Sequence, residues 1–182
     1  WIETYNLEKD ETFKNYVKAI LNQKMSEVCS TTFPQMAIPK LLSHPEYNNS
    51  LQTRIKHYEK LSNIAYNLLN DIPYTVVNRT NGSFYMTVVF NKAVLNNFQF
   101  LHIAQKQVKD YIEKITSENI ENDKRFVYYL LASTGICVVP LTSFYTSLPG
   151  FRITLLEKNI EKFENNIKTI ANKIVEYIES SK

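Results

Sequence analysis

The run Ser83-Phe84-Tyr85-Met86-Thr87-Val88-Val89-Phe90 carries the strongest strand signal in this chain of 182 residues. Aromatic and β-branched residues dominate it, and these residue types fit the pleated surface of a sheet. A shorter run of the same kind, Tyr74 to Asn78, precedes it, and Arg79-Thr80-Asn81-Gly82 lies between the two. Because Asn-Gly readily adopts positive φ, the pattern predicts a β-hairpin over residues 74–90.

Helical spacing surrounds the hairpin on both sides. Apolar residues recur every three or four positions, which is typical of helices with one buried face. Asp10 is expected to cap the first helix, and Gly135 to end the fifth in the left-handed conformation. Pro39 falls inside the second segment, where a proline disfavours a helix. The predicted helices cover residues 10–28, 35–42, 46–70, 103–115, 123–133 and 157–179.

Two more apolar runs near the end of the chain complete the predicted fold. Ile136 to Val139 reads as a strand that Pro140 ends, and Phe151 to Leu156 reads as another. The sequence therefore predicts one α+β domain over residues 1–182. We expect a small, mainly antiparallel sheet of about four strands, covered by helices, with a long amphipathic helix at the C-terminus.

The composition excludes several classes of protein. Charged residues make up 21% of the chain and the formal net charge is only +3, so nothing indicates a nucleic-acid-binding surface. No apolar run approaches the roughly 20 residues of a membrane-spanning helix, and the start of the chain lacks the features of a signal peptide. Two cysteines, Cys29 and Cys137, favour a reducing, cytoplasmic location. Because the sequence does not begin with methionine, we expect a piece of a longer protein.

The usual signals of a self-contained active site are missing from the sequence. It has three glycines and no glycine-rich loop of the kind that holds phosphate groups. His44, His57 and His102 have no metal-ligand spacing, which favours surface or capping roles. Cys137 is expected to be a small core residue. Phe84 and Tyr85 faintly resemble a nucleic-acid stacking strand, but core aromatics are favoured because few basic residues flank them.

Arg152 is the one residue whose chemistry stands out. It lies between Phe151 and Ile153 in an otherwise apolar strand, and a buried arginine needs an anionic partner. Its planar fork matches the two oxygens of a carboxylate. The pattern alone leaves open whether that partner is a ligand or an acidic residue of the same chain, or whether Arg152 lies at an edge.

Several segments, in order, resemble the C-terminal region of the class I and II aminotransferases of fold-type I, which depend on pyridoxal phosphate (PLP). Residues 134–140 (Thr-Gly-Ile-Cys-Val-Val-Pro) and 143–145 (Ser-Phe-Tyr) are similar to the family segment Gly-Ile/Val-x-Val-x-Pro-Gly-x-x-Phe-Gly. Residues 150–154 (Gly-Phe-Arg-Ile-Thr) are similar to the Phe-Arg-Ile/Leu strand that follows it, and residues 72–85 to the family hairpin Pro-x-Gly-Ala-Phe-Tyr. Residues 1–5 resemble the stretch after Ser-Lys-x-x-x-x-x-Gly-x-Arg-Gly-Gly in members that are alanine- or aspartate-aminotransferase-like.

The resemblance implies that this chain is the small domain of such an enzyme. The large domain, with the lysine that binds PLP covalently, would precede Trp1. The family arginine that binds the substrate α-carboxylate maps onto Arg152. The complete enzyme is expected to use PLP, to act on amino acids and 2-oxo acids and to form a homodimer. For this chain alone the resemblance implies no bound PLP, no catalytic residue, no metal ligand, and no nucleic-acid or membrane partner.

The sequence departs from the family pattern at three positions. Leu141 and Tyr145 stand where glycines are usual and Thr80 replaces a proline, so a different loop shape is expected. The chain also lacks the lysine motif, and its only Ser-Lys pair is at residues 181–182. Two alternatives stay open. One is a non-enzymatic α+β protein-interaction domain in which Arg152 is structural, and the other is a split gene whose product pairs with a separate large-domain polypeptide.

Overall fold

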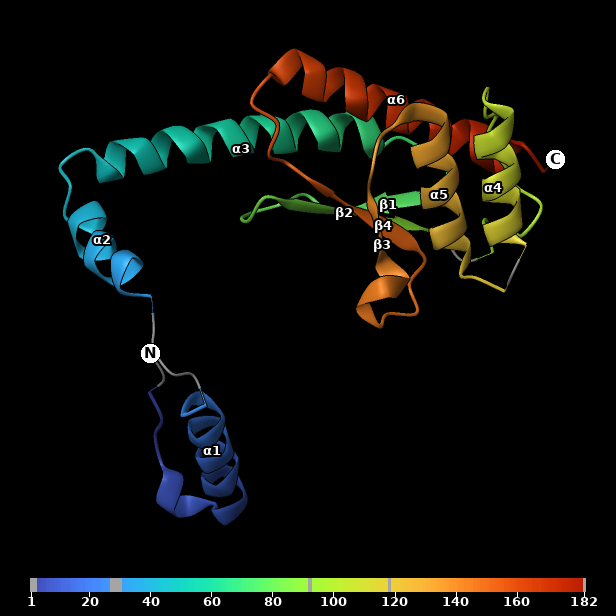
Figure 1. Ribbon diagram of the computed structural model, residues 1–182. Helices are drawn as coiled ribbons and strands as arrows, with labels where there is room; N and C mark the ends of the chain where they lie inside the picture. Colours follow the sequence, from blue (N-terminus) through green and yellow to red (C-terminus); the bar gives the residue numbers. More distant parts are fainter. Residues whose placement is uncertain (1–2, 27–30, 92, 118, 182) are drawn as a thin grey trace. The chain divides into compact units, whose positions relative to one another are not determined.

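The structure is a computed structural model that describes residues 3–26, 31–91, 93–117 and 119–181 (Figure 1). Trp1, Ile2, Cys29 and Lys182, which entered the sequence analysis, lie outside these residues. The chain divides into two compact units, residues 1–50 and 51–182.

The first unit is helical and buries little of its apolar surface. It contains a short 3₁₀ helix (Leu7–Lys9), α1 (Glu11–Lys24), α2 (Thr32–Leu42) and the first residues of α3 (Tyr47–Leu69). The side chain of Asp10 accepts a hydrogen bond from the Phe13 backbone N–H at 3.0 Å, so the predicted cap is confirmed. In α1 only Val17 is buried, and in α2 no residue is buried. Large apolar side chains are exposed along both helices: Phe13, Tyr16, Leu21, Met25, Phe33, Met36, Ile38, Leu41 and Leu42.

The helices of the second unit agree closely with the predicted ones. They are the main part of α3, then α4 (Lys106–Thr116), α5 (Asn122–Thr134) and α6 (Ile160–Glu179). Gly135 ends α5 with a φ of 75°, the left-handed conformation that the sequence predicted. The side chain of Asn159 caps α6 by accepting from the Lys162 N–H. Among the described residues, no helix is both long and apolar enough to cross a membrane.

A four-stranded sheet lies at the centre of the second unit (Figure 1). Its strands are β1 (Thr75–Val77), β2 (Tyr85–Phe90), β3 (Val139–Pro140) and β4 (Gly150–Thr154), in the order β1-β2-β4-β3. All neighbouring strands are antiparallel. The predicted α+β fold, with about four strands, covering helices and a long C-terminal helix, is therefore confirmed.

Two local predictions about the strands were wrong. The third strand is Val139 and Pro140 alone, whereas the whole run from Ile136 was expected to be extended into the sheet. Pro140 has no N–H to donate to a neighbouring strand, so pairing ends at Pro140. Residues 136–138 follow the left-handed Gly135 and pair with no strand before Val139. In the hairpin turn the residue with positive φ is Ser83, at 65°, and not Gly82.

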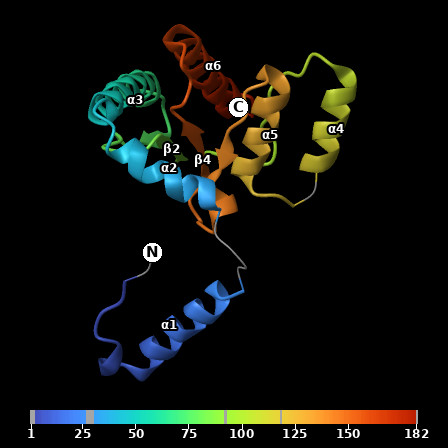
Figure 2. The ribbon, with the colours of Figure 1, turned by 60° about the vertical axis from the view of Figure 1, so that its left-hand side comes forward.

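One face of the sheet forms the core together with α3, α5 and α6 (Figures 1 and 2). The ring of Phe126 in α5 lies at its middle, with ring centroids of Phe90, Phe151 and Tyr177 between 5.1 and 5.6 Å away. Full burial of each such side chain stabilises the fold by about 1.5–3 kcal/mol relative to exposure. Residues that pair directly across antiparallel strands share a face. The strand residues of this core face are Val77, Met86, Val88, Phe90, Phe151 and Ile153.

The second face of the sheet is much less covered. Its side chains alternate with those of the core and are exposed or only partly buried. The exposed fraction reaches 53% for Val76 and 37% for Tyr85. Arg152 lies on this face, opposite Thr87 of β2 and Val139 of β3. The strand pattern thus places the one charged residue of β4 on the open side of the sheet.

Candidate functional site

Arg152 lies between two aromatic rings on the open face of the sheet. Its guanidinium carbon is 4.2 Å from the centroid of the Tyr85 ring and 4.4 Å from that of Phe144. Tyr85 comes from the start of β2, whereas Phe144 comes from the 3₁₀ helix η2 (Leu141–Phe144) just before β4. A guanidinium between two rings gains cation–π attraction from each. The rings also restrict the plane of the fork, which fixes the direction of its N–H groups. We call Arg152, Tyr85 and Phe144 the arginine clamp.

No acidic side chain neutralises the arginine clamp from within the described part of the chain. The ion pairs found there do not include Arg152. Its Nε is buried and has no hydrogen-bond partner. An unpartnered, desolvated N–H on a charged group is costly. The geometry therefore favours a partner from outside these residues, and an anion with two oxygens matches the fork best.

The loop that carries Phe144 explains two of the departures from the family pattern. Tyr145 follows η2 with a φ of 58°, a left-handed conformation that glycine adopts without cost. Tyr145 keeps that conformation, and its side chain is wholly exposed. Leu141 instead turns its side chain into the protein, where only 9% of it is exposed. The loop accommodates both residues with no loss of the ring above Arg152.

The other candidates from the sequence form no second site. The Nδ1 atom of His44 accepts from the Glu46 backbone N–H, and His57 bonds to the carbonyl oxygen of Glu157 at 3.0 Å. The contact of His44 is local and exposed, as the sequence favoured, whereas His57 is partly buried and joins α3 to the segment before α6, which the sequence did not predict. Among the described residues, no group of acidic, histidine and cysteine side chains could hold a metal ion.

Two assignments of side chains to the core were wrong. Cys137 is exposed, because it lies in the unpaired stretch between Gly135 and β3 and not in a buried strand. Tyr85 is on the open face and lies over Arg152, because alternation along β2 puts Met86 into the core and its neighbours on the other side. Phe84 is partly buried and its ring contacts that of Tyr58.

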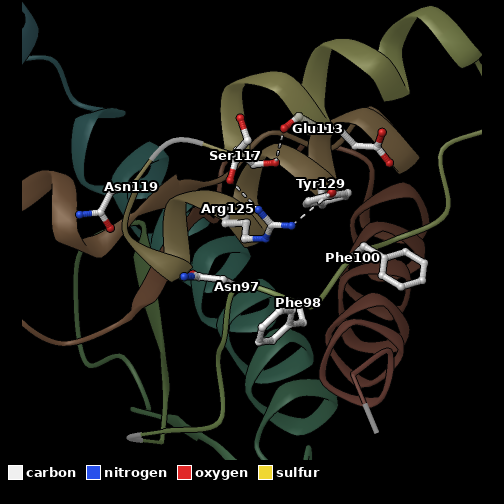
Figure 3. Close-up of a pocket in the computed structure, with 9 residues that line it drawn as sticks. Asn97, Phe98, Phe100, Glu113, Ser117, Asn119, Arg125 and Tyr129 are labelled. Carbon is white, nitrogen blue, oxygen red and sulfur yellow. Dashed lines mark hydrogen bonds between the residues drawn. The ribbon is translucent and has the colours of Figure 1, made fainter.

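A second partly buried arginine, Arg125, lines a polar hollow of about 500 Å³ beside α4 and α5 (Figure 3). Its N–H groups point at backbone and side-chain acceptors. They donate to the carbonyl oxygens of Thr116 at 2.7 Å and Gln99 at 3.3 Å, and to the hydroxyl of Tyr129 at 3.5 Å. This arginine joins the end of α4 and the segment before it to α5, so it has a structural role.

Three comparisons with known proteins agree with this fold. The family model for aminotransferases of class I and II matches residues 10–170. An uncharacterized aminotransferase of Methanocaldococcus jannaschii is 51% identical over 181 residues, which are 99% of this chain and 41% of that protein. The chain thus spans about two fifths of the length of the curated relative that it matches. The aspartate aminotransferase of Rhizobium meliloti has a similar fold, with a TM-score of 0.58 at 21% identity, over 84% of this chain and 34% of that one.

Proposed function

Because this chain belongs to the class I and II aminotransferases, we propose that it is the C-terminal part of a PLP-dependent amino acid aminotransferase. In this proposal Arg152 binds the α-carboxylate of the substrate. The observation that carries it is the arginine clamp: a guanidinium held between two rings, with a buried Nε that has no partner.

The chemistry of the clamp suits a carboxylate better than a single point charge. A guanidinium offers parallel N–H groups in a rigid fork, and a carboxylate meets two of them at once. The Tyr85 and Phe144 rings lie against the guanidinium and partly desolvate it, which strengthens its attraction to an anion. A substrate bound in this way has its Cα held at one fixed place relative to the sheet, and such orientation lowers the entropic part of the barrier.

The chain's own residues do not fit the cofactor. PLP, when bound, supplies the electron sink that lets a proton leave the substrate Cα. The side chains that contact Arg152 or pair with its strand position include no lysine for covalent attachment. The chain's only Ser-Lys pair is at residues 181–182, outside any family motif. We therefore assign to this chain the binding and orientation of substrate, and to the rest of the polypeptide the binding of PLP.

The first unit supports the idea that more polypeptide packs on this chain. It exposes apolar side chains such as Phe33 and Met25, each more than 80% exposed. Exposed apolar side chains that lie together usually mark an interaction surface. The relative from Methanocaldococcus jannaschii contains more than twice as many residues as it shares with this chain. We propose that a large cofactor-binding domain precedes residue 1, and that the complete enzyme acts on amino acids and 2-oxo acids as a homodimer.

The test uses the complete polypeptide that contains this chain. Supplied with PLP and each amino acid in turn, it is expected to release a 2-oxo acid from at least one of them, measured by mass spectrometry. The 182-residue chain alone, treated with PLP and borohydride, is expected to carry no covalent cofactor. A borohydride-stable adduct on a lysine of this chain, or a complete polypeptide that releases no 2-oxo acid from any amino acid, would contradict the proposal.

A further inference from the structure

Asp123 is a fully buried carboxylate in the first turn of α5, with none of its surface exposed. A buried carboxylate is tolerated only when hydrogen bonds replace its hydration. Asp123 accepts four. The Thr142 hydroxyl donates at 2.6 Å and the Thr142 backbone N–H at 3.0 Å, the Lys124 N–H donates at 2.8 Å and the Gly150 N–H at 3.3 Å.

The partners of Asp123 are almost all backbone groups, with no basic side chain among them. The ion pairs in the described part of the chain do not include Asp123. The positive end of the α5 helix dipole favours its charge. A carboxylate satisfied in this way holds the backbone around it in one conformation. In this case it joins α5 to a loop that comes later in the chain.

The two loop residues bound by Asp123 stand at the two ends of the same loop. Thr142 lies in η2, just before Phe144, and Gly150 is the first residue of β4. One carboxylate therefore fixes both ends of residues 142–150. The ring of Phe144 and the guanidinium of Arg152 follow those two ends directly, so the carboxylate controls how the two side chains meet.

Gly150 is fixed from its other side as well. A Cβ at this position would collide with the carbonyl oxygen of Val88 and lie 2.8 Å from the Leu141 side chain. Only glycine lets the chain approach β2 this closely while its N–H points at Asp123. The preceding carbonyl, of Pro149, accepts from the Phe90 N–H at 2.9 Å. Asp123 and β2 thus hold the start of β4 between them.

We propose that Asp123 is a positioning residue for substrate: it fixes the loop of residues 142–150 so that Phe144 lies over the Arg152 guanidinium, and it thereby sets the affinity for the substrate carboxylate. This inference rests on the proposed function of Arg152. Asp123 touches neither the substrate nor the arginine, and acts through the loop.

The test compares Asp123→Asn and Thr142→Val in the complete polypeptide. In Asp123→Asn an NH₂ group replaces one acceptor oxygen and faces backbone N–H groups, which cannot accept from it. Thr142→Val removes only the hydroxyl of Thr142. Thr142→Ser keeps the hydroxyl and serves as the rescue. Thr116→Val is the matched control, because Thr116 is also buried and its hydroxyl bonds within α4, to the Ile112 carbonyl.

Three quantities are measured for each variant. They are the KM for the amino acid, the KI of a competing carboxylic acid that lacks the amino group, and the hydrogen exchange of residues 141–150. A misplaced binding group costs on the order of 100-fold. We expect Asp123→Asn to raise KM and KI together by about 10- to 100-fold, with a smaller change in kcat and faster exchange in the loop. Thr142→Val should show a weaker form of the same effect, and Thr142→Ser and Thr116→Val none of it.

A merely structural role would give a different result. It would lower the fraction of active protein, and so the apparent kcat, with KM and KI unchanged in the molecules that remain folded. That outcome for both Asp123→Asn and Thr142→Val would overturn the inference. If the unmodified polypeptide transaminates no amino acid, the proposed function fails instead. Loop exchange then decides the positioning role by itself: unchanged exchange in Asp123→Asn refutes it, and faster exchange supports it.

Discussion

Arg152 and Arg125 are both partly buried and both lie against aromatic rings, but their N–H groups have different partners. Arg125 donates to two backbone carbonyls of its own chain and to the hydroxyl of Tyr129, which Figure 3 shows beside it. Arg152 has rings on two sides and a buried Nε with no acceptor. Proximity to an aromatic ring therefore does not distinguish a binding arginine from a structural one. The distinction lies in whether the N–H groups of the arginine have hydrogen-bond acceptors in their own chain.

The largest expected effect separates the two arginines by activity. In the complete polypeptide, Arg152→Ala should lower kcat/KM for the amino acid, because a bidentate contact to a charged group is lost. The loss of transition-state stabilisation should be on the order of 2–5 kcal/mol. Steady-state kinetics measure it, and Arg152→Lys should recover only part of the loss because lysine has no fork. An unchanged kcat/KM in Arg152→Ala would remove this residue from the site.

The second prediction separates the same two residues by stability. Arg125→Ala should lower the free energy of unfolding of the 182-residue chain by about 1–3 kcal/mol, because it leaves the Thr116 and Gln99 carbonyls without their donor. Urea unfolding of the 182-residue chain measures the change. Arg152→Ala should destabilise the chain less, because it loses the attraction to two rings but leaves no hydrogen-bond acceptor without its donor. Equal destabilisation by both substitutions would show that the two arginines have the same structural role.

The third prediction concerns Tyr177, a neighbour of Arg125 in the core. Its hydroxyl is buried without a hydrogen-bond partner, and burial raises the pKa of the phenol more than the charge of Arg125 lowers it. The unfolded chain therefore releases this proton at a lower pH than the folded one. The contribution of protonated Tyr177 to the free energy of unfolding should be fully present below about pH 10 and should be lost as the pH rises further.

Tyr177→Phe tests this directly. It removes the orphaned hydroxyl and should raise the free energy of unfolding by about 1 kcal/mol at neutral pH. It should also flatten the loss of stability above about pH 10. Urea titrations at several pH values check both effects, with Tyr111→Phe as the control because Tyr111 is 62% exposed. The same alkaline loss in Tyr177→Phe as in the unmodified chain would contradict the assignment.

The smallest effect is expected in the loop beside Arg152. Tyr145→Gly relieves a left-handed conformation and removes no buried surface, so the free energy of unfolding should rise by about 0.5 kcal/mol. The unfolding midpoint in urea shows the change. Tyr128→Gly, in the middle of α5, should be destabilising by comparison. A loss of stability in Tyr145→Gly would mean that its side chain is supported by contacts of its own.

Sequence periodicity was enough for the helices of the second unit, because each of them has apolar residues at helical spacing that face the core. Along α6 the predicted stripe is Ile160, Phe163, Ile167, Ile170 and Ile174; Ile160 is partly buried and the other four are buried. The length of a strand depends on how many of its residues pair with a neighbouring strand, and this number was predicted wrongly for β3. A strand of two residues has no period, and the apolar run before it gave no sign that it would lie outside the sheet.

The site was predictable at one residue and not at its neighbours. A charge between apolar residues is visible in the sequence, so Arg152 was identified. Tyr85 and Phe144 come from two other elements. Aromatic residues on a strand or in a loop usually pack in the core, so nothing in the sequence placed these two against Arg152. Asp123 was predicted only as the start of a helix, because the hydrogen bonds that bury it reach 19 and 27 residues ahead.

The shortness of β3 has a consequence for how copies of this chain behave toward each other. It is the outermost strand on its side of the sheet, where an unpaired backbone would recruit a strand from a neighbouring molecule. Two residues, one of them a proline without an N–H, offer almost no ladder for such recruitment. This edge of the sheet is therefore protected against edge-to-edge association with a strand of another copy.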